Sequence, residues 1–305
     1  MELSLVIPIY NEEPLIEPLL QRVFSSLPAI TEDFEVICVD DGSRDGSLAR
    51  LIECRRRDRR LKIIVLSRNF GHQAAYTAGL EHARGKYVVM MDGDLQDPPE
   101  LIPDMVAKAE AGSFDIIHAR RRTRQEGFFR KILMLGFHAV FRRLSGLEDV
   151  QNIGNFSLMN QPAVQALLSF REKSRYLPGL RFFIGFEQGF VEYERDSRFS
   201  GQPKMGLGLL YKLALDAIFS FSEIPIRICF FIGMAGIVIC FFAFLYVIIS
   251  KITGIAPFGW SSTTLSIYFM GFVQLLFLGI LGEYLFRTYH ETRNRPVYLI
   301  RKIIE

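Results

Sequence analysis

The sequence predicts an α/β fold with a mostly parallel sheet and flanking helices, followed by a hairpin of two transmembrane helices. Short apolar runs rich in β-forming residues alternate with helix-like segments over the first 120 residues. Two long apolar stretches follow in the C-terminal part of the chain. Half of the 305 residues are hydrophobic, and their uneven distribution separates the two parts.

Five runs have the length and composition of buried strands. They are LSLVIPIY (3–10), FEVICVD (34–40), LKIIVLS (61–67), KYVVMMD (86–92) and FDIIHAR (114–120). Helical patterns lie between them, for example from Glu13 to Leu27 and from Gly46 to Asp58. This alternation predicts a mostly parallel sheet covered by helices, in which ligands bind beyond the carboxyl ends of the strands.

Polar residues follow four of these strands where each one ends. They are Asn11-Glu12-Glu13, Asp40-Asp41-Gly42-Ser43, Arg68-Asn69 and Asp92-Gly93-Asp94. Taken singly, each motif is also compatible with an ordinary turn or helix cap. Because neighbouring parallel strands end at the same edge, we expect the four to converge on one crevice.

The segment Asp92-Gly93-Asp94-Leu95-Gln96-Asp97-Pro98 is the most specific of these motifs. Two carboxylates one residue apart follow a buried strand and can hold a divalent cation, with substrate phosphates completing the shell. Mg²⁺ and Mn²⁺ prefer such oxygen ligands. A solvated acidic turn is the alternative.

Two apolar stretches have the length of membrane spans. Ile226 to Ser250 carries only Arg227 as a charge, and Thr264 to Tyr284 carries only Glu283, at its far end. About 20 apolar residues cross a bilayer, whereas a buried core helix is the alternative. Arginines flank the pair, and the connection between the spans carries only Lys251, so the positive-inside rule places both termini in the cytoplasm.

We therefore expect a catalytic-type domain at 1–205, an interfacial amphipathic helix at 206–225, two transmembrane helices within 226–286 and a cytoplasmic tail at 287–305. The segment 128–144 has a similar amphipathic composition. No signal peptide is evident, so we expect the N-terminal domain of this two-pass membrane protein to stay in the cytoplasm.

The cysteines, the net charge and the histidines do not indicate a zinc site, disulfides or nucleic-acid binding. The four cysteines show no zinc-binding or disulfide spacing, and the net charge of +3 is too small for a nucleic-acid binder. The five histidines show no metal-ligand spacing, and we expect each to be a surface or core residue.

The segments VIPIYNEE, VDDGS, LSRNFGHQAAYTAGL and MMDGDLQDPPE together resemble glycosyltransferase family 2, whose catalytic domain has the GT-A fold. The C-terminal GEYLFRTYHETRNRPVY resembles the polyprenyl-phosphate glycosyltransferases of that family. The resemblance implies a nucleotide-sugar donor, a polyprenyl phosphate acceptor and a metal ion. The expected location is a bacterial inner (plasma) membrane.

The resemblance also assigns roles to individual positions. It implies a nucleotide-sugar site made of Pro8, Tyr10, Glu12, Asp40, Asp41, Asp92, Gln96 and Arg120. It implies that Asp92, Asp94 and Gln96 organise Mg²⁺ or Mn²⁺, and that Arg130, Arg198 and Lys204 meet phosphate charges. Contacts with anionic lipid headgroups are the alternative for these three cations.

One position departs from the family pattern, because Asn155 stands where relatives usually carry an acidic residue. An amide cannot accept a proton as a carboxylate does, but a phosphate monoester is already mostly a dianion at cytoplasmic pH. Its oxygen needs no dedicated base, whereas a sugar hydroxyl would need one. We therefore expect Asn155 to position groups by hydrogen bonding. The alternatives are that Asp149 acts in its place, or that the substitution marks altered sugar choice or reduced activity.

The expected function is inverting transfer of a sugar, with glucose from UDP-glucose as the first candidate, to a polyprenyl phosphate. A membrane polysaccharide synthase and a non-catalytic scaffold or transport protein are the rivals. Gly271, Gly279 and Gly282 would allow close helix packing, in keeping with a homo-oligomer. The identity of the sugar, the nucleotide and the lipid chain, the number of subunits and the downstream pathway do not follow from the sequence.

Overall fold

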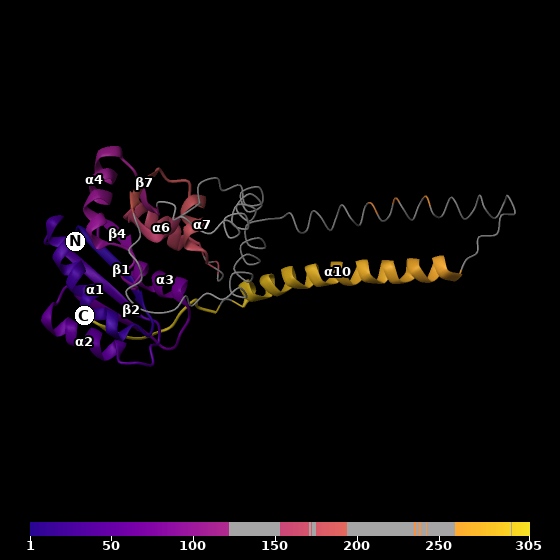
Figure 1. Ribbon diagram of the computed structural model, residues 1–305, viewed down its shortest axis with the longest axis horizontal. Helices are drawn as coiled ribbons and strands as arrows, with labels where there is room; N and C mark the ends of the chain where they lie inside the picture. The colour runs from indigo at the N-terminus through magenta and orange to yellow at the C-terminus, as the bar shows by residue number, and fades with distance from the viewer. Residues whose placement is uncertain are drawn as a thin grey trace, which may run out of the picture. The chain divides into compact units, whose positions relative to one another are not determined.

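A computed structural model of the chain describes residues 1–121, 153–170, 172, 175–193, 235, 238, 242, 260–293 and 295–305 (Figure 1). The chain forms two compact units. The first holds the sheet and includes residues 295–305, whereas the helix α10 (Trp260–Thr292) belongs to the second. The two units are described separately.

In the described residues, the first unit is built on an eight-stranded sheet with the order β7-β5-β6-β4-β1-β2-β3-β8. The strands are β1 (Leu3–Ile9), β2 (Phe34–Asp40), β3 (Leu61–Leu66), β4 (Tyr87–Met90), β5 (Ile116–Arg121), β6 (Ile153–Asn160), β7 (Gln188–Tyr193) and β8 (Ile300–Ile304). The four central strands β4, β1, β2 and β3 are parallel. Strand β6 is antiparallel to β4 and β5, and β8 is antiparallel to β3. The mixed, mostly parallel sheet and the five predicted strands are confirmed.

Helices separate the strands in the order that the sequence predicts. They are α1 (Glu13–Ser26), η1 (Leu27–Ala29), α2 (Ser47–Arg57), α3 (His72–His82), η2 (Pro99–Leu101), α4 (Ile102–Gly112), α6 (Gln161–Ser169) and α7 (Leu177–Phe183). The two helices predicted near 13–27 and 46–58 are confirmed to within one residue of their ends.

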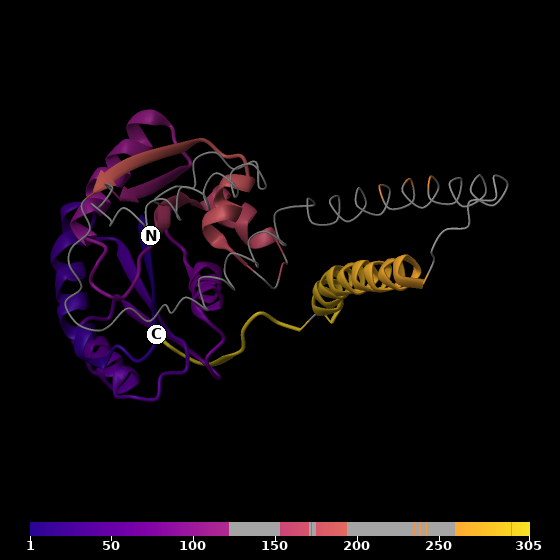
Figure 2. The same cartoon turned by 45° about the vertical axis from the view of Figure 1, so that its right-hand side comes forward.

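Both faces of the central sheet are covered, since every residue of β1 and β2 is buried. Alternate β1 residues such as Leu5 and Ile7 pack in one core cluster with α1, α2 and α4. Helix α3 covers the opposite face (Figure 2). Its backbone approaches the sheet closely at Gly79, where an added Cβ would lie 2.2 Å from Val6 Cγ1.

The C-terminal part contains two elements. Helix α10 (Trp260–Thr292) includes an 18-residue stretch, Phe269–Phe286, that is long and apolar enough to cross a membrane. The predicted first span, 226–250, lies outside the described residues apart from the helical positions 235, 238 and 242. The predicted amphipathic segments 128–144 and 206–225 also lie outside them.

Strand β8 was not predicted, because residues 287–305 were expected to form a tail. It pairs with the edge strand β3, from Ile304 opposite Ile63 to Ile300 opposite Leu66. The pairing continues beyond the strand, where the Ser67 N–H donates to the Leu299 carbonyl at 2.8 Å. The last residues of the chain therefore complete the sheet of the first unit.

Candidate active site

The ends of β1 and β2 are joined by hydrogen bonds between the loops that follow them. Asn11 adopts the left-handed region with φ 52°, which asparagine tolerates better than most residues. Its N–H donates to Ser43 Oγ at 3.1 Å, and its Oδ1 accepts the Arg44 N–H at 2.8 Å. This brings two of the predicted polar strand ends together.

Asp41 joins the end of β2 to the loop that precedes α3. Its two carboxylate oxygens accept the N–H groups of Phe70 at 2.7 Å and Gly71 at 2.9 Å. Burial raises the pKa of Asp41, and these two hydrogen bonds offset only part of that effect. Both oxygens thus support the loop from which α3 begins.

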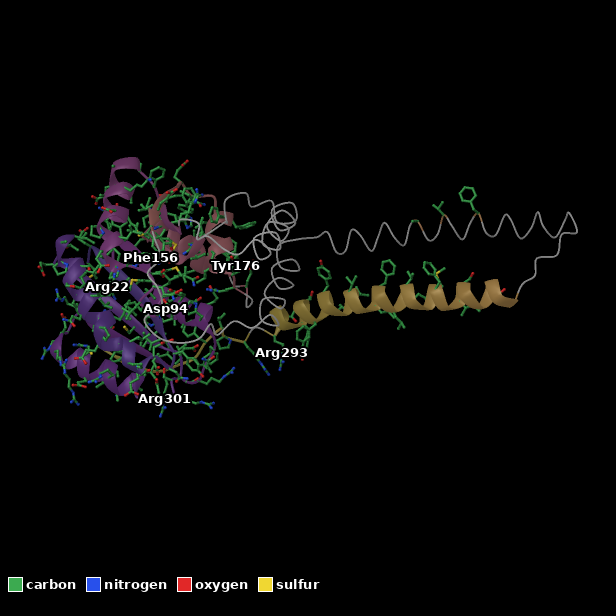
Figure 3. The ribbon with its side chains drawn as sticks, in the orientation of Figure 1. Arg22, Asp94, Phe156, Tyr176, Arg293 and Arg301 are labelled. Carbon is green, nitrogen blue, oxygen red and sulfur yellow. The ribbon has the colours of Figure 1, made fainter. Side chains whose placement is uncertain are left out.

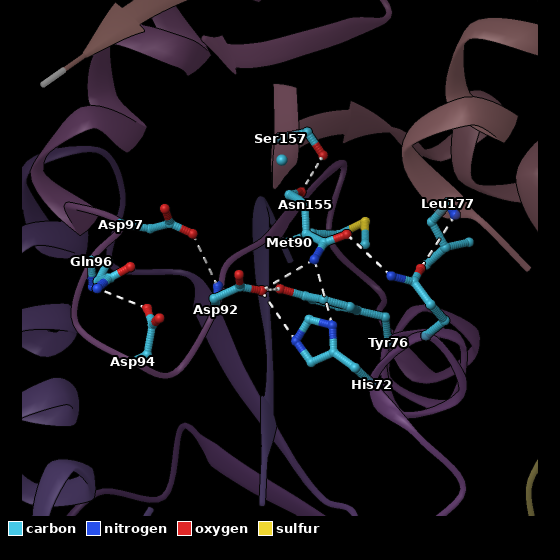
Figure 4. A network of polar contacts seen from close by, with 12 residues as sticks. His72, Tyr76, Met90, Asp92, Asp94, Gln96, Asp97, Asn155, Ser157 and Leu177 are labelled. Atoms are coloured by element: carbon cyan, nitrogen blue, oxygen red, sulfur yellow. Dashed lines mark hydrogen bonds and ion pairs between the residues drawn. The ribbon is translucent and has the colours of Figure 1, made fainter. Parts of the chain in front are cut away.

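Asp92, which follows β4, is where the candidate site converges (Figure 4). Its Oδ1 accepts the Tyr76 hydroxyl at 2.7 Å and the Asn155 amide at 3.4 Å. The same oxygen lies 3.2 Å from His72 Nε2. Residues of α3, β4 and β6 therefore meet at one carboxylate oxygen.

Asp92 and His72 each stabilise the charged form of the other. Burial raises the pKa of Asp92, but the hydrogen bond and charge of His72 and the hydrogen bonds from Tyr76 and Asn155 outweigh it, so the pKa is lowered. Burial lowers the pKa of His72, but Asp92, Asp41 and Asp94 outweigh it, so that pKa is raised. Asp92 is therefore ionised at neutral pH, with 20% of its side chain exposed.

The turn that carries Asp94 is held by its own backbone. Leu95 adopts φ 60°, and the Gln96 N–H donates to Asp94 Oδ1 at 3.2 Å. Asp97 is buried, accepting the Asp92 N–H at 3.3 Å and the Tyr193 hydroxyl at 2.8 Å. Asp97 thus anchors the turn to β7, while Asp94, labelled in Figure 3, remains partly exposed.

Asn155 is held on both sides of its amide. Its Nδ2 lies within 3.5 Å of both Asp92 Oδ1 and His72 Nδ1, and its Oδ1 accepts from Gln73 Nε2 at 3.4 Å. The next side chain, Phe156, is buried edge-to-face against Tyr193. The amide is therefore oriented towards the end of β4.

A buried arginine lies behind this segment. Arg181 of α7 has no exposed surface and donates to the carbonyls of Gly154 and Asn155 and to Ser157 Oγ. Burial lowers its pKa to about 10, which leaves the guanidinium charged at neutral pH.

Other predicted residues lie at the same edge of the sheet. Pro8 is buried within β1, and Tyr10, just beyond that strand, is 39% exposed. The Glu12 N–H donates to Ser47 Oγ at 3.0 Å, and Asp40 accepts the Ser43 N–H at 3.2 Å. In β5 the Arg120 guanidinium lies 4.1 Å from the ring centroid of Phe190. The predicted Arg130, Arg198 and Lys204, and the alternative base Asp149, lie outside the described residues.

The sequence analysis missed several members of the cluster. His72, which the sequence analysis treated as an ordinary surface or core residue, lies with its Nε2 3.2 Å from Asp92 Oδ1 and belongs to the cluster. His72, Gln73 and Tyr76 belong to a motif that directly follows a strand end, so their position was a usable signal. Nothing in the sequence pattern distinguishes Arg181 or Asp97.

The residues present are compatible with a divalent cation. Asp92 and Asp94 supply oxygen ligands of the kind Mg²⁺ and Mn²⁺ prefer. In the described part of the chain, no group of three or more His, Cys, Asp or Glu side chains is arranged to hold a metal. A cation here would need further ligands from a substrate, as a diphosphate can provide.

Similar proteins identify the family of this chain. The model of the family "Glycosyl transferase family 2" matches residues 4–170. An uncharacterised glycosyltransferase of Synechocystis sp. is 40% identical over 302 residues, covering 98% of this chain and 95% of that protein. A prophage bactoprenol glucosyl transferase homolog of Escherichia coli is 33% identical over 99% of both chains. The bactoprenol glucosyl transferase of Shigella phage SfX is 34% identical over 99% of both chains.

Solved structures share the fold at low identity. Glucosyl-3-phosphoglycerate synthase from Mycobacterium tuberculosis, in complex with Mn²⁺, UDP-glucose and phosphoglyceric acid, has a TM-score of 0.52 and 19% identity over 72% of this chain and 79% of its own. A mannosyltransferase from Pyrobaculum calidifontis, in complex with GDP-Man and Mn²⁺, has a TM-score of 0.51 and 18% identity over 70% of this chain and 60% of its own. The sheet is thus GT-A-like, and this chain belongs to glycosyltransferase family 2.

Proposed function

We propose that this chain transfers a sugar from a nucleotide-sugar to a polyprenyl phosphate at the cytoplasmic face of a membrane, giving a polyprenyl-phosphate sugar. UDP-glucose is the first candidate donor. The observation that supports this proposal most strongly is the similarity of the whole chain, including its C-terminal part, to proteins named bactoprenol glucosyl transferase. The proposal assigns that reaction to the cluster around Asp92.

In this proposal the nucleotide-sugar lies across the ends of β1, β2 and β4. The residues proposed to bind it are Pro8, Tyr10, Glu12, Asp40, Asp41, Asp92, Gln96 and Arg120. The loops after β1 and β2 are cross-linked through Asn11, which supports a preformed pocket. A preformed pocket reduces the ordering that the donor would otherwise impose on binding.

Asp92, Asp94 and Gln96 are the residues we propose to hold Mg²⁺ or Mn²⁺ together with the donor. When bound, the cation would supply positive charge to the departing nucleoside diphosphate. The Mn²⁺-containing structures of two proteins with the same fold support this choice of metal. Arg130, Arg198 and Lys204 are proposed to offset the remaining phosphate charge.

The chemical step is proposed as one in-line displacement with inversion. A phosphate oxygen of the acceptor forms a bond to C1 of the sugar, while the bond from C1 to the diphosphate oxygen breaks. The acceptor is already deprotonated, so no residue needs to take its proton. Asn155, held by Gln73, His72 and Asp92, would orient the reacting groups by hydrogen bonding.

Helix α10 supports a membrane location for the acceptor. Large side chains such as Ile267, Phe269 and Leu275 are each at least 65% exposed, unlike those of a buried core helix. We propose that α10 and the segment 226–250 form two transmembrane helices, with 1–205 and both termini in the cytoplasm. We also propose that the segment 206–225 lies in the interface and that the protein is a homo-oligomer.

The test is a transfer assay with the full chain in detergent. Polyprenyl phosphate, radiolabelled nucleotide-sugars and Mg²⁺ are incubated with the protein, and label is counted in the organic phase. Labelled lipid is expected with one donor, and unphosphorylated polyprenol should remain unlabelled because its hydroxyl needs a base. Failure of every donor would refute the proposal in favour of a scaffold or transport protein. A growing polysaccharide would indicate a synthase instead.

A further inference from the structure

Strand β6 is irregular at the point where it carries Asn155. Its partners on β5 are His118 opposite Ser157 and Arg120 opposite Ile153. Gly154, Asn155 and Phe156 therefore stand opposite the single residue Ala119, which is a bulge. Bulges interrupt the ladder of backbone hydrogen bonds and re-aim side chains, often beside active sites.

The side chain of Arg181 supplies hydrogen bonds at this interruption. Its Nη2 donates to the Gly154 carbonyl at 2.6 Å, and its Nη1 donates to the Asn155 carbonyl at 2.8 Å and to Ser157 Oγ. The Ser157 hydroxyl in turn donates to the Asn155 carbonyl at 3.0 Å. One guanidinium thus binds three acceptors within four consecutive residues.

Helix α7 also supports the side-chain amide of Asn155, through Gln73. The N–H of Leu177, the first residue of α7, donates to Gln73 Oε1 at 3.2 Å, and Gln73 Nε2 donates to Asn155 Oδ1. The Arg181 carbonyl accepts from Gln188 Nε2 at 3.2 Å, which ties α7 to β7. Both the backbone and the amide of Asn155 are therefore supported from α7.

Burying a charged guanidinium is costly compared with an apolar side chain of similar size. In the described residues, no carboxylate forms an ion pair with Arg181, so its burial is compensated by its hydrogen bonds to β6 and by the nearby charge of Asp92. An apolar side chain could fill the same space at lower cost, so the buried guanidinium beside Asp92 indicates a role other than packing.

We propose that Arg181 is a positioning residue, which holds the β6 bulge in the one conformation that directs the Asn155 amide towards Asp92. This inference rests on the proposed function, because it assigns Arg181 a role in sugar transfer through Asn155.

A double-mutant cycle in the transfer assay tests it. Arg181→Met removes the donors while keeping much of the volume, and it should lower kcat about 100-fold, as a 1 Å misplacement can. Asn155→Ala should cause a similar loss. If Arg181 acts through Asn155, the double variant should be no worse than Asn155→Ala by more than about threefold.

Losses that multiply would overturn the inference, as would full activity of Asn155→Ala. Leu51→Ala, which leaves a cavity where the buried face of α2 meets the core, serves as the control for lost stability. Leu51→Ala should retain the wild-type kcat even if its Tm falls as far as that of Arg181→Met. If Arg181→Met does not fold, Arg181→Lys enters the same cycle, because a single ammonium cannot reproduce the forked geometry.

Hydrogen exchange at residues 153–160 gives a second readout that needs no activity. Arg181→Met should raise exchange at 154–157 well above its level in Leu51→Ala. Unchanged protection would refute the positioning role. If the wild-type chain transfers no sugar, the proposed function fails, and exchange alone decides the role of Arg181.

Discussion

His72 Nε2 and the Tyr76 hydroxyl lie 3.2 Å and 2.7 Å from the same atom, Oδ1 of Asp92. The two residues are one helical turn apart on α3 and so share a face of that helix. The first turn of α3 therefore holds the end of β4. This relationship links α3 to the acidic turn of the candidate site.

Asp94→Asn should abolish transfer, with a fall of about 100-fold or more, because it removes the charge proposed to hold the cation at the diphosphate. The transfer assay measures the change, and Tm should stay within the error of the wild type. Asp104→Asn removes an exposed carboxylate from α4 and should have full activity. Undiminished turnover of Asp94→Asn would refute its metal role.

Tyr76→Phe should destabilise the first unit by about 1–3 kcal/mol, since it deletes a buried hydrogen bond to a charged acceptor. Tyr76 is fully buried, so its ring packing is kept and only the hydroxyl is lost. Urea unfolding followed by circular dichroism provides the measurement. Tyr87→Phe is the control and should change the free energy of unfolding by less than about 0.5 kcal/mol. Equal effects of the two variants would contradict the prediction.

His118 should make the protein less stable as the pH falls below about 6.5. Burial lowers the pKa of His118 to about 3, with the charges of Arg181 and Arg120 adding to the effect despite the hydrogen bond with Gln188. Between the folded and unfolded pKa values the unfolded chain binds more protons, so stability rises with pH and is fully present above the unfolded value. From pH 7.5 to pH 5 the expected loss is about 2 kcal/mol.

The comparison of His118→Gln with the wild type measures this contribution. The variant should show a shallower dependence of its unfolding free energy on pH, whatever its absolute stability. Leu51→Ala keeps the histidine and should retain the wild-type slope. Parallel pH profiles for His118→Gln and the wild type would refute the assignment.

Deletion of residues 296–305 should destabilise the first unit, because it removes β8 and leaves unpaired the edge of β3 that faces away from β2. It also removes the hydrogen bond from the Tyr298 hydroxyl to Glu81 at 2.5 Å. A fall in Tm of at least about 5 °C is expected. Deleting Glu305 alone removes a half-exposed ion pair with Lys62 and should have little effect. An unchanged Tm in the longer deletion would show that β8 is dispensable.

The central part of the fold could be predicted because its evidence is local. Strands β1 to β4 are apolar runs of strand length, and α1 carries Leu15, Leu19 and Val23 on one buried face. The polar residues at Asp41, Asp92 and Asn11 stand where those runs end. Parallel pairing brings such ends to one edge, so the convergence of these polar residues could be predicted from the alternation of strands and helices.

The edges of the sheet were harder to predict from the sequence. Strand β8 is solvent-exposed over much of its length and pairs with a strand more than 230 residues earlier. Its sequence reads as a basic tail, and only the free edge of β3 makes it a strand. The bulge in β6 likewise depends on the register that β5 imposes, which no property of residues 153–160 indicates.

The sequence by itself determined the alternating architecture, the family and the acidic turn at Asp92 and Asp94, because periodicity and short motifs are properties of neighbouring residues. Only the tertiary structure decided that His72, Tyr76 and Asn155 meet at Asp92 Oδ1 and that Arg181 lies behind them. These contacts join α3, β4, β6 and α7. Their formation depends on how the elements pack, and packing couples residues that the sequence separates.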